Sequence, residues 1–144
     1  MDHAAHISPA DIFEATLDGT LGFELLEIRP DRVVGRMPVT DRVRQRRGLV
    51  HGGAYAALAE LLASEATAAN VDGGDDLLVM GASNHTSFLR PVTEGTVTGR
   101  GRPLHRGRSS WIWDIDLTDD GGRPCAVARV TIAVRRRSSL EPAT

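Results

Sequence analysis

The chain contains no lysine and only one cysteine. All 17 of its basic residues are arginine, and with 19 acidic residues the formal net charge is −2. A balance this close to neutral argues against a partner that binds through overall charge, such as nucleic acid or an anionic membrane. The single cysteine, Cys125, excludes an internal disulfide and a cysteine-based metal cluster. It stands in an apolar run, which is typical of a small core residue.

Long apolar runs and a leader pattern are also missing. No stretch approaches the ~20 apolar residues of a membrane span, and the first residues do not follow the basic-then-apolar order of a signal peptide. We therefore expect a cytoplasmic protein. His85, His105 and the two N-terminal histidines have no metal-ligand spacing with carboxylates or thiols, so we expect no metal and no other cofactor.

The length of 144 residues suits one domain with a core of its own. We place this domain at residues 1–137 and a disordered tail at 138–144. A short helix is expected from Ser8 to Gly19, with Ser8 as its N-cap. The connections between strands are too short for parallel crossovers, which predicts an α+β fold with a helix on an antiparallel sheet. The expected strands are 21–28, 32–39, 77–89 with a bulge at Gly81, 96–102, 109–117 and 124–134.

The longest predicted helix runs from Ala54 to Ala69 and contains neither proline nor glycine. Alanine, the best helix former, dominates it. Gly52 and Gly53 precede it, and because they lack side chains they leave the first backbone N–H groups uncovered. These groups carry the positive end of the helix dipole, so the helix start can stabilise a developing negative charge. The alternative is that the two glycines only allow the helix to pack closely on the sheet.

Glu60 is an isolated carboxylate in an apolar part of this helix. At about 100° per residue it shares one face with Ser64 and Thr67, and Gly53 continues that face toward the helix start. Glu65 points about 140° away from it, and we expect Glu65 to be an ordinary solvated acid. The alternative for Glu60 is that it is only a surface residue of an amphipathic helix.

Five short motifs connect these residues with a known family. They are Gly48-Leu49-Val50-His51-Gly52-Gly53, Leu58-Ala59-Glu60, Phe88-Leu89-Arg90-Pro91, Glu94-Gly95 and Pro103-Leu104-His105-Arg106-Gly107-Arg108. Residues 20–134 resemble the hotdog-fold acyl-CoA thioesterases. The resemblance is closest to the 4-hydroxybenzoyl-CoA and 1,4-dihydroxy-2-naphthoyl-CoA thioesterases, which carry glutamate at the position of Glu60, whereas the phenylacetyl-CoA branch usually carries aspartate. It implies a curved antiparallel sheet wrapped around a long central helix.

The resemblance also implies hydrolysis of an acyl-CoA to free acid and CoA, with an aryl or other bulky acyl group. Glu60 would act as nucleophile or general base, and the Gly52 N–H would polarise the thioester carbonyl. Gln45 matches a family glutamine that hydrogen-bonds near the thioester. Ser64 matches a hydroxyl that positions water or the carboxylate, and His51 matches a residue that shapes the site. Solvated loop and helix positions remain the alternatives for Gln45 and Ser64.

A second set of positions matches the family's contacts with the coenzyme. Arginine suits phosphate because its planar guanidinium donates two parallel hydrogen bonds, although solvated strand ends are the alternative for each arginine. The residues before Arg90 depart from the naphthoyl-CoA relatives, which often carry histidines there, so the identity of the acyl group stays open. The set comprises Gly53, Thr86, Ser87, Phe88, Arg90, Arg102, His105, Arg106 and Arg108.

Two functions other than an enzyme stay open: a non-catalytic hotdog module that binds acyl-CoA, and a structural role in an assembly. A binding module needs no carboxylate on the helix, so Glu60 favours the enzyme. One alanine-rich helix and a single sheet leave edge strands unpaired, which predicts at least a dimer. The resemblance implies that two hotdogs share a continuous sheet with sites at their interface, and that dimers often pair again into a homotetramer.

Overall fold

The sheet and the long helix account for most of the residues that the computed structural model describes, 15–140. Six antiparallel strands stand in the order β1-β2-β4-β5-β6-β3, which confirms the predicted fold class. In chain order the elements are α1 (Leu17–Leu21), β1 (Glu24–Arg29), β2 (Arg32–Pro38), η2 (Asp41–Val43), α2 (Gly52–Asn70), η3 (Gly74–Asp76), β3 (Leu77–Phe88), β4 (Thr96–Arg106), β5 (Ser110–Thr118), β6 (Pro124–Arg136) and η4 (Arg137–Ser139).

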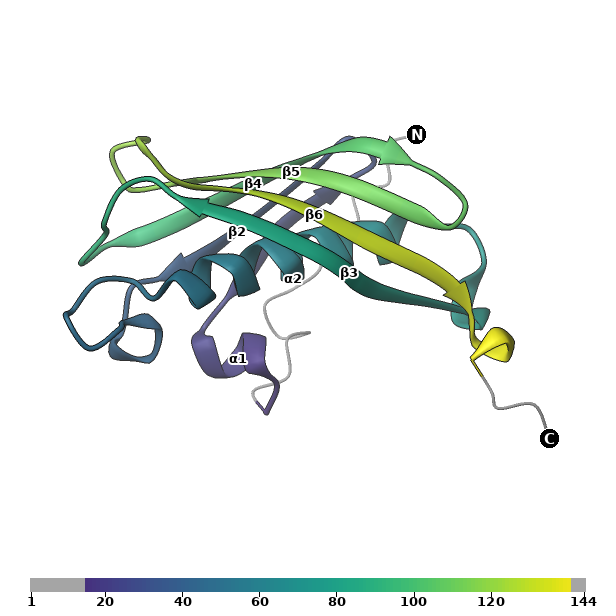
Figure 1. Cartoon of the computed structure of the whole chain (residues 1–144), viewed down its shortest axis with the longest axis horizontal. Helices are drawn as coiled ribbons and strands as arrows, with labels where there is room; N and C mark the ends of the chain where they lie inside the picture. The colour runs from purple at the N-terminus through teal and green to yellow at the C-terminus, as the bar shows by residue number, and fades with distance from the viewer. Residues whose placement is uncertain (1–14, 141–144) are drawn as a thin grey trace.

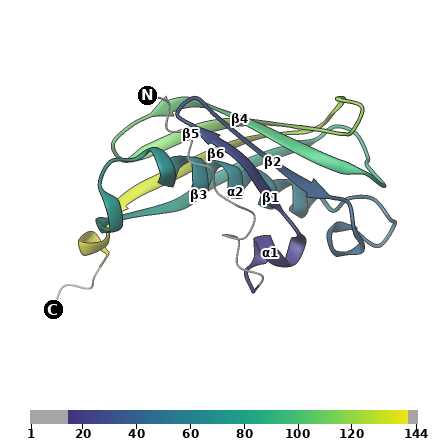
Figure 2. The same cartoon turned by 180° about the vertical axis from the view of Figure 1, so that it is seen from behind.

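The sheet curves around α2. In Figure 1 β3 passes in front of the helix, and Figure 2, seen from behind, shows β1 and β2 in front of it. The short helix α1 packs against α2 and lies below it in Figure 1, on the side away from β4 and β5. None of the helices within residues 15–140 has the length and apolarity to cross a membrane.

The helix α2 approaches the sheet closely because small residues line the contact. Leu58 and Leu62 are fully buried on its inner side, and burying one leucine contributes about 1.5–3 kcal/mol. A Cβ added at Gly35 of β2 or Gly99 of β4 would lie 2.5 or 2.6 Å from a methyl carbon of Leu62. The two strands therefore cross the helix where they carry no side chain.

One polar contact is buried inside this core. Trp113 of β5 points inward, as the alternating pattern predicts, and its indole N–H donates to Thr67 Oγ1 at 2.9 Å. The Thr67 hydroxyl in turn donates to the Ala63 carbonyl oxygen at 2.7 Å. Thr67 is fully buried. Thr67 therefore lies in the core, whereas Glu60 is exposed, although helical geometry places both on one face of α2.

The N-terminal helix ends later than the sequence predicts. Residues 8–14 of the predicted helix lie outside the described residues. Within the described part, α1 is capped by Thr16 and continues past Gly19 to Leu21. Gly22 adopts a left-handed φ of 76°, which glycine tolerates best, and it ends the helix. As a result β1 begins only at Glu24.

Two strands run further than predicted. β4 continues through Pro103 to Arg106, with an irregular pairing to β5 between Pro103 and His105. β6 continues to Arg136 and is followed by the 3-10 turn η4. The arginines at 135 and 136 are therefore part of the sheet, although the predicted strand ends at residue 134. Residues 141–144 of the predicted tail lie outside the described residues.

The predicted bulge in β3 is confirmed and changes which residues face the helix. Gly81 pairs with Ile132 of β6, but Ser83 pairs with Thr131, so the register shifts by one residue. Before the bulge, odd-numbered positions of β3 face α2. After it, even-numbered positions do, beginning with Asn84, whose side-chain N–H donates to the Ala56 carbonyl oxygen of α2 at 2.9 Å.

Candidate active site

The start of α2 presents one free backbone donor. His51 is the N-cap, and its Nδ1 accepts a hydrogen bond from the Gly53 N–H at 2.8 Å. The Ala54 N–H donates to the His51 carbonyl oxygen at 2.9 Å. The Gly52 N–H has no acceptor among residues 15–140. Of the two donors predicted from the sequence, the structure therefore leaves Gly52 free and engages Gly53 with the imidazole.

Phe88, the last residue of β3, covers this helix start. A Cβ added at Gly52 would lie 2.7 Å from Cζ of the Phe88 ring, so only glycine allows the approach. The ring also lies 6.0 Å from that of Tyr55, tilted by 34°. Phe88 is nevertheless 58% exposed. An apolar surface open to a ligand therefore lies directly beside the free donor.

Glu60 lies on the exposed side of α2, two turns after the helix start, and its carboxylate faces Gly81 of β3. Ser64 lies one turn further along and is half-buried. Gly52 and Glu60 are eight residues apart, which is about 12 Å along a helix axis. Within one protomer, the donor and the carboxylate are therefore too far apart to act on the same carbonyl group.

Two further carboxylates lie close to this part of α2. Glu65 is half-buried, and burial together with the charge of Asp18 raises its pKa above the ordinary value. Burial raises the pKa of Asp18 on α1 as well, with a smaller contribution from the charge of Glu60. The prediction that Glu65 is an ordinary solvated acid is wrong, because α1 packs over that side of the helix.

Gln45 lies in a tight loop that leads into the helix start. Its N–H donates to the Leu49 carbonyl oxygen at 2.7 Å, its carbonyl oxygen accepts from the Gly48 N–H at 3.0 Å, and its side-chain Oε1 accepts from the Arg47 N–H. Gly48 has a left-handed φ of 85°. The side chain of Gln45 is half-buried. The loop thus fixes Gln45 in the segment that precedes His51.

The bulge in β3 separates residues that the sequence groups together. Thr86 and Phe88 pair with Ala128 and Ala126 of β6 on the face toward α2, whereas Ser87 faces the opposite side of the sheet. There it lines a hollow of about 530 Å³. Arg102 lines the same outer hollow and forms an ion pair with Asp114, N to O 3.4 Å. The side chains of Ser87 and Arg102 therefore lie on the outer face of the sheet, away from α2.

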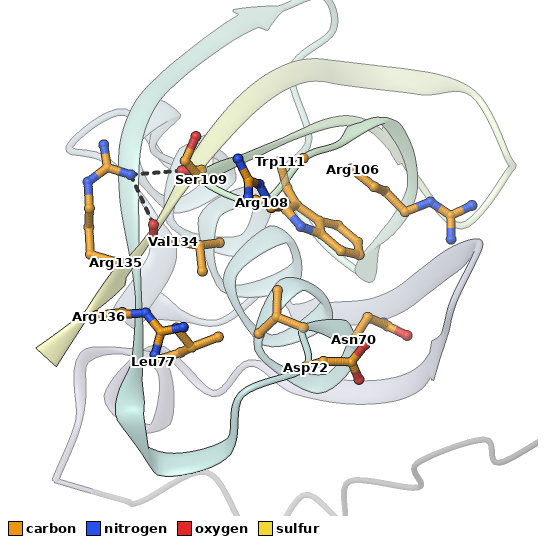
Figure 3. Close-up of a pocket in the computed structure, with 12 residues that line it drawn as sticks. Asn70, Asp72, Leu77, Arg106, Arg108, Ser109, Trp111, Val134, Arg135 and Arg136 are labelled. Carbon is orange, nitrogen blue, oxygen red and sulfur yellow. Dashed lines mark hydrogen bonds between the residues drawn. The ribbon is translucent and has the colours of Figure 1, made fainter.

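A larger pocket of about 600 Å³ opens at the other end of α2, beside Asn70 (Figure 3). Arg106, the last residue of β4, and Arg108, in the turn between β4 and β5, line it, and both are predicted to bind the coenzyme. The end of β6 adds Arg135 and Arg136, and the side chain of Trp111 lies among these residues.

The four arginines of this pocket differ in how they are held. The Arg135 guanidinium donates to the carbonyl oxygens of Ser109 at 2.8 Å and Val134 at 3.0 Å. Arg136 forms an ion pair with Asp76, N to O 2.8 Å. Neither Arg106 nor Arg108 forms an ion pair with any of residues 15–140. Two guanidiniums are therefore free to bind an anion, and two are anchored beside them.

The predicted coenzyme set thus does not lie in one place. Gly53, Thr86, Phe88 and Arg90 belong to the start of α2 or to the strand end beside it, whereas Arg106 and Arg108 lie at the end of α2. His105 is exposed, is the next-to-last residue of β4 and lies beside Gly107. Arg135 and Arg136 are absent from the predicted set. The alternation of valine and isoleucine at positions 130, 132 and 134 indicates that the strand continues toward them.

A curved antiparallel sheet wrapped around a long helix is the hotdog fold. Residues 47–126 match the Thioesterase superfamily. The chain belongs to this family, which confirms the family and the enzyme class that the sequence motifs predict.

Named relatives agree with this assignment. The proofreading thioesterase EntH of Cronobacter turicensis is 41% identical over 119 residues, which cover 83% of this chain and 85% of that protein. The crystal structure of the thioesterase HI1161 from Haemophilus influenzae superposes with a TM-score of 0.80 at 32% identity, and the match covers 90% of this chain and 88% of that one.

A third similar protein is known from structures of two variants. It is SAV0944 of Staphylococcus aureus, and its Glu→Ala variant superposes with a TM-score of 0.81 at 31% identity, covering 84% of this chain and 99% of that one. The other variant is a Gln→Ala substitution, with a TM-score of 0.79 at 31% identity, covering 83% of this chain and 98% of that one. The substituted glutamine and glutamate are 15 positions apart in that chain.

Proposed function

We propose that the protein hydrolyses the thioester of an acyl-CoA, and that Gly52 and Glu60 carry the reaction. The observation that carries the proposal is the Gly52 N–H, which is the free donor at the positive end of α2. A tetrahedral intermediate places negative charge on the former carbonyl oxygen, and a backbone donor aimed at that oxygen contributes about 2.7–4 kcal/mol. His51 supports this role because it holds the neighbouring Gly53 N–H and so fixes the cap.

Glu60 is the proposed nucleophile or general base. As nucleophile, a carboxylate oxygen attacks the thioester carbon and the CoA thiolate leaves, and water then hydrolyses the resulting mixed anhydride to the free acid and the Glu60 carboxylate. As base, the carboxylate takes the proton from a water that attacks the thioester carbon, and the CoA thiolate leaves and takes up a proton. The positions substituted in the Staphylococcus aureus protein support this choice, because Gln45 and Glu60 are also 15 positions apart. We assign Gln45 and Ser64 to the positioning of the thioester and of the Glu60 carboxylate or water.

The separation along the helix implies that two protomers build each site. Gly52 and Glu60 of one chain cannot meet at one carbonyl, so we propose that Gly52 of one protomer and Glu60 of its partner do. The outer edge of β3 supports this pairing, since β3 is the last strand of the sheet and, among the described residues, only β6 pairs with it. Pairing of two such edges forms the predicted dimer, and two dimers form the predicted homotetramer.

The pocket at the end of α2 is the proposed site for the phosphates of CoA. Its four arginines supply positive charge, and guanidinium groups bind phosphate through paired N–H donors. The exposed Phe88 ring beside Gly52 supports an aryl or other bulky acyl group, because it offers apolar surface next to the reacting carbonyl.

A panel of aryl-CoA and aliphatic acyl-CoA thioesters tests the proposal. We expect turnover of several members, with kcat/KM highest for aryl or other bulky groups. Binding of acyl-CoA without release of CoA would instead support the non-catalytic module. That module leaves the exposed carboxylate on α2 without a role, which is why we favour the enzyme.

A further inference from the structure

Gly81 occupies an unusual position in β3, next to the proposed catalytic carboxylate. It is the last residue of the strand before the bulge, and it pairs with the buried Ile132 of β6 on the face toward α2. Its backbone φ lies outside the left-handed region. The backbone conformation therefore does not require glycine here, and another reason must account for the absence of a side chain.

The space around Gly81 supplies that reason. The three heavy atoms nearest to an added Cβ all belong to Glu60: Cδ would lie at 3.0 Å, Cγ at 3.6 Å and Oε1 closest of all. Gly35 and Gly99, which also face α2, would meet the buried Leu62 side chain instead. Gly81 is thus a glycine whose missing side chain makes room for an exposed carboxylate rather than for the core.

The bulge also fixes the distance between β3 and this turn of α2. Because the register shifts, Asn84 faces the helix, and its Nδ2 donates to the Ala56 carbonyl oxygen at 2.9 Å. The Asn84 Oδ1 accepts from the Thr86 hydroxyl at 2.7 Å, which holds the amide in this orientation. Ala56 lies one helical turn before Glu60, so this hydrogen bond holds the strand against the helix beside the carboxylate.

We propose that Gly81 is a positioning residue for Glu60: its missing side chain leaves the space in which the Glu60 carboxylate rests against β3. The inference rests on the proposed catalytic role of Glu60. A methyl group at Gly81 would displace the carboxylate by roughly 0.5–1 Å, since carbon atoms in ordinary contact are about 3.5–4.0 Å apart. A displacement of this size at a reacting group lowers a rate by on the order of 10²-fold.

The test is Gly81→Ala, measured by steady-state hydrolysis of an aryl-CoA and by thermal unfolding. We expect kcat to fall on the order of 10²-fold, while KM and the unfolding midpoint stay near the wild-type values, because only a flexible exposed side chain has to move. The matched control is Ser83→Ala, which changes the same strand across the bulge on the outer face and should keep the wild-type kcat.

The same substitution in a Glu60→Gln background separates positioning from a structural effect. If Gly81 acts through Glu60, it should have no further effect on the residual rate of that variant. A wild-type kcat for Gly81→Ala, a lowered unfolding midpoint, failure to fold, or an equal loss in the Glu60→Gln background would each overturn the inference. Wild-type turnover by Glu60→Gln alone would instead contradict the proposed function on which the inference rests.

Discussion

Replacing Arg106 and Arg108 together by alanine is expected to raise the KM for acyl-CoA and to leave kcat nearly unchanged. Both guanidiniums line the pocket at the end of α2, and neither forms an ion pair within residues 15–140. Both are exposed, so we assign about 0.5–1 kcal/mol to each phosphate contact. Loss of both then amounts to about 1–2 kcal/mol, which raises KM roughly 5–30-fold. The contacts exist before and during the reaction, so kcat is spared.

The assay compares an acyl-CoA with the same acyl group on a short pantetheine thioester that lacks the nucleotide. The double variant should hydrolyse the short thioester at the wild-type kcat/KM. A matched control is Arg100→Ala, which removes an exposed arginine from the outer face of the same strand and should leave both substrates unaffected. An equal loss on the two thioesters would refute the reasoning, because the arginines would then support the fold rather than bind phosphate.

The remaining predictions concern buried polar groups. Thr67→Val removes the acceptor of the buried Trp113 indole N–H and should lower the free energy of unfolding by about 1–3 kcal/mol. Urea denaturation measures this change, and an unchanged denaturation midpoint would contradict the role of this hydrogen bond. Glu65→Gln should raise the unfolding midpoint at pH 7, because a carboxyl with a raised pKa destabilises the folded state when it is ionised. The gain in the unfolding midpoint should shrink as the pH falls through the raised pKa of Glu65. It should vanish below the pKa of Glu65 in the unfolded chain, near 4.5, where the carboxyl of the wild type is as neutral as the amide of the variant. A gain that persists there would show that charge is not the cause.

The parts of the fold that depend on local sequence could be predicted. The run from Ala54 to Ala69 lies within the observed helix α2, and Gly52 stands at its start with the free donor that the glycine pair predicts. The bulge at Gly81 also follows from the sequence, because glycine inside a strand pattern marks such sites. The α+β class follows from the short connections between strands.

The parts that depend on packing between distant segments could not be predicted. A helical projection places Thr67 on the same face as Glu60, but it cannot show that the sheet wraps far enough around α2 to bury Thr67 under Trp113. It also cannot show that α1 packs over Glu65 and raises the pKa of its carboxyl. In both cases the position of another segment, rather than the helix itself, decides the environment of the side chain.

The strand assignments show a similar limit. The bulge itself is visible in the sequence, but its effect on facing depends on the pairing with β6, and that pairing turns Ser87 away from Thr86 and Phe88. The sequence does not indicate a role for the arginines at 135 and 136 for a related reason, since a basic run near the end of a chain is also typical of a solvated tail. Only the continued pairing of β6 with β3 brings them to the pocket that Arg106 and Arg108 line.

The most direct test of the proposed mechanism is the turnover of Glu60→Gln on an aryl-CoA thioester, measured beside its binding and its thermal unfolding. The amide keeps the shape of the side chain and removes its charge, and Glu60 is exposed, so the unfolding midpoint and the affinity for acyl-CoA should stay close to wild type. The kcat should fall by at least about 10²-fold, which is the lower end of the range of rate losses expected when a positioned acid–base group is removed. It should fall further if Glu60 is the nucleophile. Hydrolysis at close to the wild-type rate, in protein checked for deamidation, would remove Glu60 from the mechanism and make His51 the next residue to test.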